Sequence, residues 1–190
     1  MRAESADRAD HWWVVKEGER VKQFVRFSGR VIVAHVVTYV GVGVLAYAFL
    51  THQFFEPQGL AAQVMRTPAD PQLWSHVTRW MLPAQVLRGL LIAIVLFPFV
   101  PTLSGWNYWR RVATLAGLYV VLGQWASTVA GSGTIEGWLI LRPEFTEPRI
   151  VLAAMAEGLI QGIALAAWLA WWMTSAPTGA ASDATAQTTR

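Results

Sequence analysis

Residues 31–50 read VIVAHVVTYVGVGVLAYAFL, a run of 20 residues without a formal charge. The hydrocarbon core of a bilayer takes roughly 20 apolar residues to cross as a helix. Because lipid offers the backbone no hydrogen-bond partners, a single spanning segment of this kind has to be helical. This stretch therefore predicts a transmembrane helix and, with it, an α-helical membrane protein.

Three further apolar runs are long enough to cross a bilayer, at residues 82–103, 112–130 and 150–173. The only formal charges inside these runs are Arg88 in the first of them and Glu157 in the last. The sequence thus predicts an all-α fold, a polytopic membrane helix bundle with four transmembrane helices that form one domain over residues 31–173.

Composition supports this class. The chain is 54% hydrophobic and 14% charged, whereas soluble domains carry about a quarter charged residues. Most of its 11 tryptophans lie at the edges of the apolar runs, where an amphipathic indole meets the interface between hydrocarbon and water. The alternative, an aromatic-rich soluble core, explains this placement less well.

The distribution of Lys and Arg predicts the orientation. With a cytoplasmic N-terminus, the cytoplasmic segments hold ten of the 15 basic residues, the outer loops hold four, and Arg88 is the last. The positive-inside rule makes the Ser104–Arg111 hairpin cytoplasmic. We therefore expect both termini in the cytoplasm, in a pattern typical of bacterial inner membranes. The first run could instead be a signal peptide cleaved after Ala48, but the preceding region is longer than such signals carry.

Segments outside the spans are expected to be partly helical. Within a cytoplasmic N-terminal segment, residues 1–30, His11–Phe27 mixes apolar residues with four cations, which predicts an amphipathic interfacial helix. In the first outer loop Asp70-Pro71 predicts a helix start, followed by a short surface helix that ends near Pro83. Residues 174–190 are small and polar without periodicity, which predicts a disordered cytoplasmic tail.

Three shorter features predict details of packing. Pro98 and Pro101 are expected to kink the second span or end it early. Gly158-Leu-Ile-Gln-Gly162 is a small-xxx-small face that lets another helix approach closely. The apolar Trp138–Leu141 segment of the second outer loop is expected either to dip into the interface or to cover the bundle.

Polar residues inside the spans are costly, so each is a candidate functional residue. Arg88, Gln124 and Glu157 lie at a similar depth in the outer third, and Gln161 follows one turn below Glu157 on the same face. An arginine and a carboxylate at matched depth would pair most cheaply with each other. The cluster is therefore either an ion pair that fixes neighbouring helices, or a pocket for a small polar ligand or for protons. In a third interpretation, Arg88 snorkels to the outer headgroups.

His35 is the one histidine well inside a predicted span. We expect it to form an intramembrane hydrogen bond with a neighbouring helix, for example with Ser, Thr or a backbone carbonyl. As a ligand of haem or a chlorin it would need a partner at similar depth, and the other three histidines lie outside the spans. No cofactor is expected.

The sequence does not predict an enzyme. The chain has no cysteine, which excludes disulfides, iron–sulfur clusters, Cys-ligated zinc and thiol catalysis. It also lacks nucleotide-binding, zinc-protease and serine-hydrolase motifs, and we expect no metal. Its basic residues flank apolar runs, so nucleic acid is not an expected partner.

Two classes of function remain. One is a non-enzymatic membrane protein: a subunit, assembly factor or regulator that acts through helix packing, with a membrane-protein partner or as a homo-oligomer. The alternative is a protein that handles a small polar ligand or protons, using the Arg88–Glu157–Gln124 cluster.

Overall fold

The computed structural model describes residues 17–174, and the predictions made for residues 1–16 and 175–190 lie outside this range. The described chain is helical and contains no strand. Its elements are, in order, α2 (Glu17–Ala46), the π-helix η1 (Tyr47–Thr51), the 3-10 helices η2 (His52–Phe54) and η3 (Ala61–Gln63), α3 (Pro71–Leu96), the 3-10 helix η4 (Phe97–Phe99), α4 (Val100–Ser104), α5 (Tyr108–Gly117), the π-helix η5 (Leu118–Trp125), α6 (Ile135–Ile140), the 3-10 helix η6 (Pro143–Phe145) and α7 (Pro148–Thr174).

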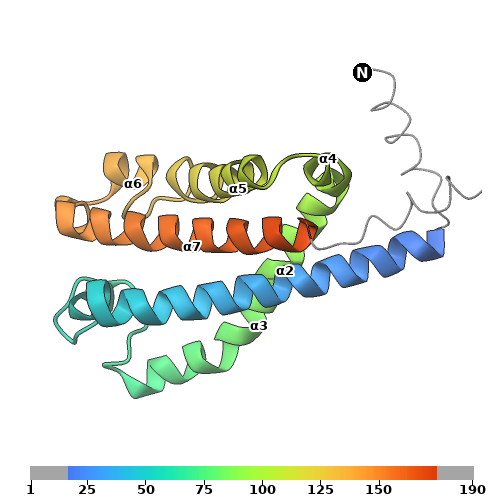
Figure 1. Cartoon of the computed structure of the whole chain (residues 1–190). Helices are drawn as coiled ribbons and strands as arrows, with labels where there is room; N and C mark the ends of the chain where they lie inside the picture. Colours follow the sequence, from blue (N-terminus) through green and yellow to red (C-terminus); the bar gives the residue numbers. More distant parts are fainter. Residues whose placement is uncertain (1–16, 175–190) are drawn as a thin grey trace, which may run out of the picture.

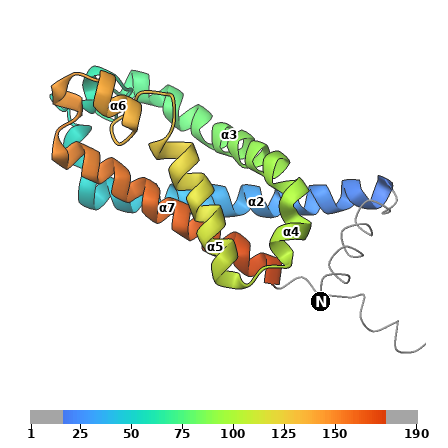
Figure 2. The ribbon, with the colours of Figure 1, turned by 90° about the horizontal axis from the view of Figure 1, so that it is seen from above.

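The long helices pack side by side in the order α5, α7, α2, α3 (Figure 1). The central pair, α7 and α2, therefore has a neighbour on each side, whereas α3 and α5 make no extensive contact with each other. Figure 2 shows α4 turning the chain between α3 and α5, at the end of the bundle opposite α6. We call the α6 end, which carries the 51–70 and 126–147 loops, the long-loop end.

Three helical segments are long and apolar enough to cross a membrane: Gly18–Phe54, Pro71–Ser104 and Pro148–Met173. They contain the first, second and fourth predicted spans, so the described chain is compatible with a membrane protein. The third predicted span, 112–130, is not among them. Its helix starts earlier, at Tyr108, because the Asn107 side chain caps it by accepting from the backbone N–H of Arg110 at 2.8 Å. It also ends earlier, because the π-helix η5 stops at Trp125.

The start of α3 is as predicted, but its course is not. The Asp70 side chain caps the helix by accepting from the backbone N–H groups of Gln72 and Leu73, at 3.0 and 3.1 Å. The helix then continues through Pro83 to Leu96, so the prediction of a separate surface helix ending near Pro83 is wrong. Proline removes only one backbone donor, and Pro83 is exposed, which keeps its ring away from the packed face.

Other boundaries follow the sequence more closely. Pro98 and Pro101 end α3 as predicted, through η4 and the short helix α4. The described part of the predicted interfacial helix, residues 17–27, forms the first turns of α2 without a break before the span. In α6 the side chains of Trp138 and Leu139 are 73% and 71% exposed, so this segment does not cover the bundle.

The core lies where α2, α3, α5 and α7 meet. Its fully or almost fully buried members are small or aliphatic, which lets the helices approach closely. They are Val31, Ala34, Ala93, Leu96, Leu103, Val112, Leu115, Leu165, Ala166, Leu169 and Ala170.

Candidate functional site

The register between α2 and α3 positions Arg88. Gln85, Gly89 and Ala93 form a buried stripe at four-residue spacing on α3, which is one face of a helix. A Cβ added at Gly89 would lie 2.8 Å from the Cα of Ile32, so this glycine is what allows the two helices to cross so closely. Arg88, next to Gly89 in the chain, is exposed on a different face of α3.

His35 is fully buried at the same crossing and pairs with a side chain that the sequence analysis had not singled out. Its Nε2 lies 3.1 Å from the Oε1 of Gln85, within hydrogen-bond distance. Since the amide oxygen only accepts, Nε2 is the protonated ring nitrogen. The other ring nitrogen, Nδ1, is buried without a partner. The described residues contain no group of three or more His, Asp or Glu side chains that could hold a metal ion.

On the other side of the bundle, the Gln124 side chain links η5 to α7 by a hydrogen bond. Its Nε2 donates to the backbone carbonyl of Ala154 at 3.0 Å, and its amide lies where a side chain at Gly158 would be. One turn further along α7, a Cβ added at Gly162 would lie 2.5 Å from a methyl group of Val120. The predicted Gly158–Gly162 face is therefore the surface on which η5 packs.

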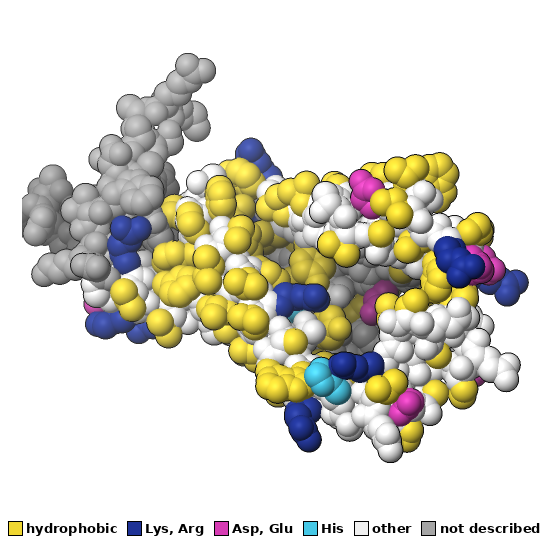
Figure 3. Space-filling model, turned by 180° about the vertical axis from the view of Figure 1, so that it is seen from behind, with side chains coloured by type: hydrophobic (Ala, Val, Ile, Leu, Met, Phe, Trp, Pro, Cys, Tyr) yellow, Lys and Arg dark blue, Asp and Glu magenta, His cyan; other side chains and the backbone are white. Residues whose placement is uncertain are grey.

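These contacts leave a polar pocket of about 470 Å³ between α3, η5 and α7. It brings together all four residues of the predicted cluster, from three different helices. Figure 3 shows a hollow in this face of the molecule, with an acidic side chain deep inside it and a cationic one at its edge. The polar pocket is lined by Arg88, Tyr119, Gly123, Gln124, Ala154, Glu157, Gly158 and Gln161.

Arg88 and Glu157 do not form the direct ion pair that their matched depth predicted. Among the described residues the ion pairs are Lys22–Glu19 and Arg142–Glu144, both outside the pocket. Arg88 comes from α3 and Glu157 from α7, which are not neighbours in the bundle. The two charges therefore face a shared open space instead of closing it.

Two further polar atoms of the pocket lack hydrogen-bond partners: Oε1 of Gln124 and Nε2 of Gln161. The orientation of the Gln124 amide follows from its bond to a backbone carbonyl, which can only accept and so must face the NH2 group. Gln161 is 93% buried, since its exposed fraction is 7%. An unpartnered buried polar group is costly, and a polar group placed in the pocket would remove this cost.

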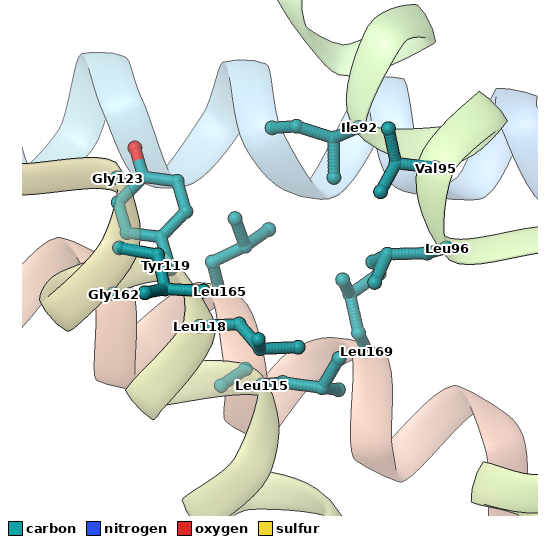
Figure 4. Close-up of a pocket in the computed structure, with 12 residues that line it drawn as sticks. Ile92, Val95, Leu96, Leu115, Leu118, Tyr119, Gly123, Gly162, Leu165 and Leu169 are labelled. Carbon is teal, nitrogen blue, oxygen red and sulfur yellow. The ribbon is translucent and has the colours of Figure 1, made fainter. Parts of the chain in front are cut away.

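An apolar pocket of about 360 Å³ adjoins the polar one. Figure 4 shows its aliphatic side chains converging from α3, from α5 and η5, and from α7. Tyr119 and Gly123 line both pockets, so the two cavities meet at these residues. The remaining lining of the apolar pocket is Ile92, Val95, Leu96, Leu115, Leu118, Leu122, Gly162, Leu165, Ala166 and Leu169.

At the opposite end of the bundle Arg111 is buried, with an exposed fraction of 6%. Its guanidinium donates to the backbone carbonyl of Ala170 through Nη1 and to that of Trp106 through Nε, both at 3.0 Å. Ala170 lies in the second-last turn of α7, which ends at Thr174, and the helix dipole favours a cation near this end. The neighbouring Arg110 instead stacks on Trp106, 4.1 Å from the ring centroid.

Sequence reasoning missed Tyr119, Gly123 and Gln85 as parts of this region. The four-residue spacing of Gln85, Gly89 and Ala93 places one polar and two small residues on one face, which is typical of a helix-packing face. For Tyr119 and Gly123 no such signal exists, because a π-helix changes which residues share a face.

Comparisons with protein-family models, with curated proteins and with solved structures found no match for this chain.

Proposed function

We propose that this chain is a membrane-embedded binding protein that takes a small polar ligand in its polar pocket. The observation that carries the proposal is that Arg88 and Glu157 line one cavity of about 470 Å³ without pairing with each other. A purely structural ion pair would close this space. Two unsatisfied charges kept apart are instead suited to a ligand that pairs with both.

The pocket offers complementary groups. Arg88 and the NH2 of Gln161 donate hydrogen bonds, whereas Glu157 and the Oε1 of Gln124 accept them. A ligand with an anionic group toward Arg88 and a cationic or donating group toward Glu157 would satisfy all four. The same groups could relay protons, but the volume exceeds what a file of water molecules needs, so the geometry favours ligand binding over proton transfer.

The proposed setting is a bacterial inner membrane that the chain crosses four times, with α5 and η5 as the third span. Tyr108–Trp125 has 18 residues, near the lower limit for crossing a bilayer. The basic Ser104–Arg111 hairpin and both termini would face the cytoplasm. The polar pocket would then open toward the outer side.

The competing proposal is a subunit, assembly factor or regulator that acts through a membrane-protein partner or a second copy of the chain. It is supported by large side chains that remain exposed on the outer face of α3, including Leu87, Leu91 and Ile94. Lipid covers such a face equally well, so this observation favours a partner less strongly than the polar pocket favours a ligand.

Cysteine labelling tests whether the pocket is open to water. The chain has no cysteine of its own, so Ala154→Cys would introduce a single thiol in the wall of the polar pocket. Leu152→Cys is the matched control, because Leu152 is 66% exposed on α7, two residues away, and does not line the pocket. A membrane-impermeant thiol reagent is applied to each protein in lipid vesicles.

We expect Ala154→Cys to react several-fold faster than Leu152→Cys, and phosphoethanolamine, a small zwitterion, to slow its reaction. Equal rates at the two positions, or no protection by the zwitterion, would refute the proposed function.

A further inference from the structure

The two pockets lie directly beside each other, because Tyr119 and Gly123 line both. The polar and the apolar pocket together are called the amphipathic groove below. All charged groups lie in the polar part, whereas the apolar part is lined by aliphatic side chains, glycines, Ala166 and the ring of Tyr119. A single occupant that fits both parts must have a polar end and an apolar end.

The apolar part extends along α7. On α7 it runs from Gly162 to Leu169, which is about 10 Å at 1.5 Å per residue. It follows the helix axes, as acyl chains do in a bilayer. Its other lining residues come from α3 and from α5 and η5. Since α3 and α5 make no extensive contact with each other, an acyl chain between them would separate no packed pair of helices.

The polar part determines the kind of headgroup. It holds one cation, Arg88, and one carboxylate, Glu157, and their formal charges cancel. A headgroup with only a negative charge would satisfy Arg88 and leave Glu157 unpaired, at a cost that is large inside a membrane. A zwitterionic headgroup with an N–H donor satisfies both, and also reaches the unpartnered oxygen of Gln124.

From this groove we propose that the ligand is an aminophospholipid, whose phosphate faces Arg88, whose ammonium faces Glu157 and one of whose acyl chains occupies the apolar pocket. The inference rests on the proposed function and narrows it to a lipid substrate class. Lipid binding of this kind differs from ordinary solvation by lipid. Solvating lipid contacts only the outer surface of α7, whereas the acyl chain of the bound lipid would contact Leu165 and Leu169, which are each 3% exposed.

The probe is phosphatidylethanolamine with a photoreactive diazirine in one acyl chain, added in trace amount to the full chain in nanodiscs of phosphatidylglycerol. After illumination, mass spectrometry locates the crosslinks. We expect them at Leu165 and Leu169 in excess of Ile163, which is 46% exposed on the same helix and does not line the groove. Unlabelled phosphatidylethanolamine should compete about tenfold more strongly than added phosphatidylglycerol.

Two glycine variants on one helical segment provide a test and its matched control. Gly123→Phe fills the junction of the pockets, where an added Cβ meets no atom closer than 4.0 Å. Gly117→Phe adds the same side chain at a residue that lines neither pocket and where an added Cβ meets nothing within 4 Å. The groove crosslinks should be lost in Gly123→Phe and kept in Gly117→Phe. Glu157→Gln should abolish the preference for phosphatidylethanolamine.

The outcomes separate this inference from the proposed function. Crosslinks spread evenly over exposed residues, or equal competition by the two lipids, would overturn the aminophospholipid while Ala154→Cys remains protected by phosphoethanolamine. If that protection is also absent, the proposed function itself fails. Crosslinks at Leu165 and Leu169 that disappear only in Gly123→Phe would establish the groove as the lipid site.

Discussion

Two charged residues, Arg88 and Glu157, decide whether the polar pocket between the helices is an open space or is closed by an ion pair. Arg88 and Glu157 were expected to pair, yet they come from helices that are not neighbours and face one polar pocket. Neither charge is therefore paired with the other. This separation leads to a measurable expectation about their energetic coupling.

A double-mutant cycle with Arg88→Leu and Glu157→Leu tests this expectation. The changes in the free energy of unfolding should add to within about 0.5 kcal/mol, as they do for residues without direct contact. Unfolding in detergent at increasing denaturant concentration gives the four free energies. A coupling well above that value would show that a direct ion pair forms after all.

His35 and Gln85 should behave in the opposite way. They share a hydrogen bond in a buried environment, so Gln85→Leu leaves both ring nitrogens of His35 unpartnered and should cost about 1–3 kcal/mol. The double variant His35→Leu with Gln85→Leu should recover part of this loss, because no polar group then remains buried. Thermal unfolding of Gln85→Leu, His35→Leu and the double variant measures these losses, and strictly additive losses would contradict the pairing.

At the scale of elements, glycines set how closely the helices pack. A Cβ added at Gly89 meets the backbone of Ile32, whereas one at Gly158 meets the end of the flexible Gln124 side chain. Backbone cannot give way without moving a whole helix, but a side chain can swing aside at the loss of one hydrogen bond. The two glycines therefore differ in how well they tolerate substitution.

An alanine series makes this difference measurable. Gly89→Ala should destabilise by about 1–3 kcal/mol, as overpacking usually does. Gly158→Ala should cost less, about 1 kcal/mol, the value of the Gln124 hydrogen bond that it displaces. Gly117→Ala meets nothing within 4 Å and should be neutral or slightly stabilising. Equal losses for Gly89→Ala and Gly117→Ala would contradict the close crossing of α2 and α3.

The end of α7 depends on a cation from another helix. Arg111 is buried and bonded to two carbonyls, whereas Arg110 is exposed and stacks on Trp106. Arg111→Gln should therefore cost about 1.5–3 kcal/mol, and Arg110→Gln about 0.5–1 kcal/mol. Chemical unfolding of the two variants compares them directly. If Arg110→Gln were the more destabilising, the capping role of Arg111 would be excluded.

At the scale of the whole molecule, the proposed topology makes opposite predictions for its two ends. The long-loop end should face the periplasm and the Ser104–Arg111 hairpin the cytoplasm. A phosphatase reporter that is active only in the periplasm should be active when fused after Gln58 and inactive when fused after Trp106. Activity after Trp106 alone would reverse the orientation.

The sequence by itself determined the class of the fold, because the bilayer requires long uninterrupted apolar helices and their length and composition are local properties. It located the three helical segments that are long and apolar enough to cross a membrane, the cap at Asp70 and the break at Pro98 and Pro101 in this way. It also identified four of the residues that line the polar pocket, Arg88, Gln124, Glu157 and Gln161, since polar groups stand out against apolar runs.

Only the tertiary structure decided how those residues are related. The depth of Arg88 and Glu157 in their helices can be counted along the chain, but whether they touch depends on the order of helices around the bundle. That order depends on close contacts at Gly89, Gly158 and Gly162. Each of these contacts joins residues that are far apart in the sequence. The π-helix η5 likewise ends the third predicted span early and turns Tyr119 and Gly123 toward the groove. A hydrophobicity pattern does not contain this information, because a change in helical pitch alters the packing face without altering composition.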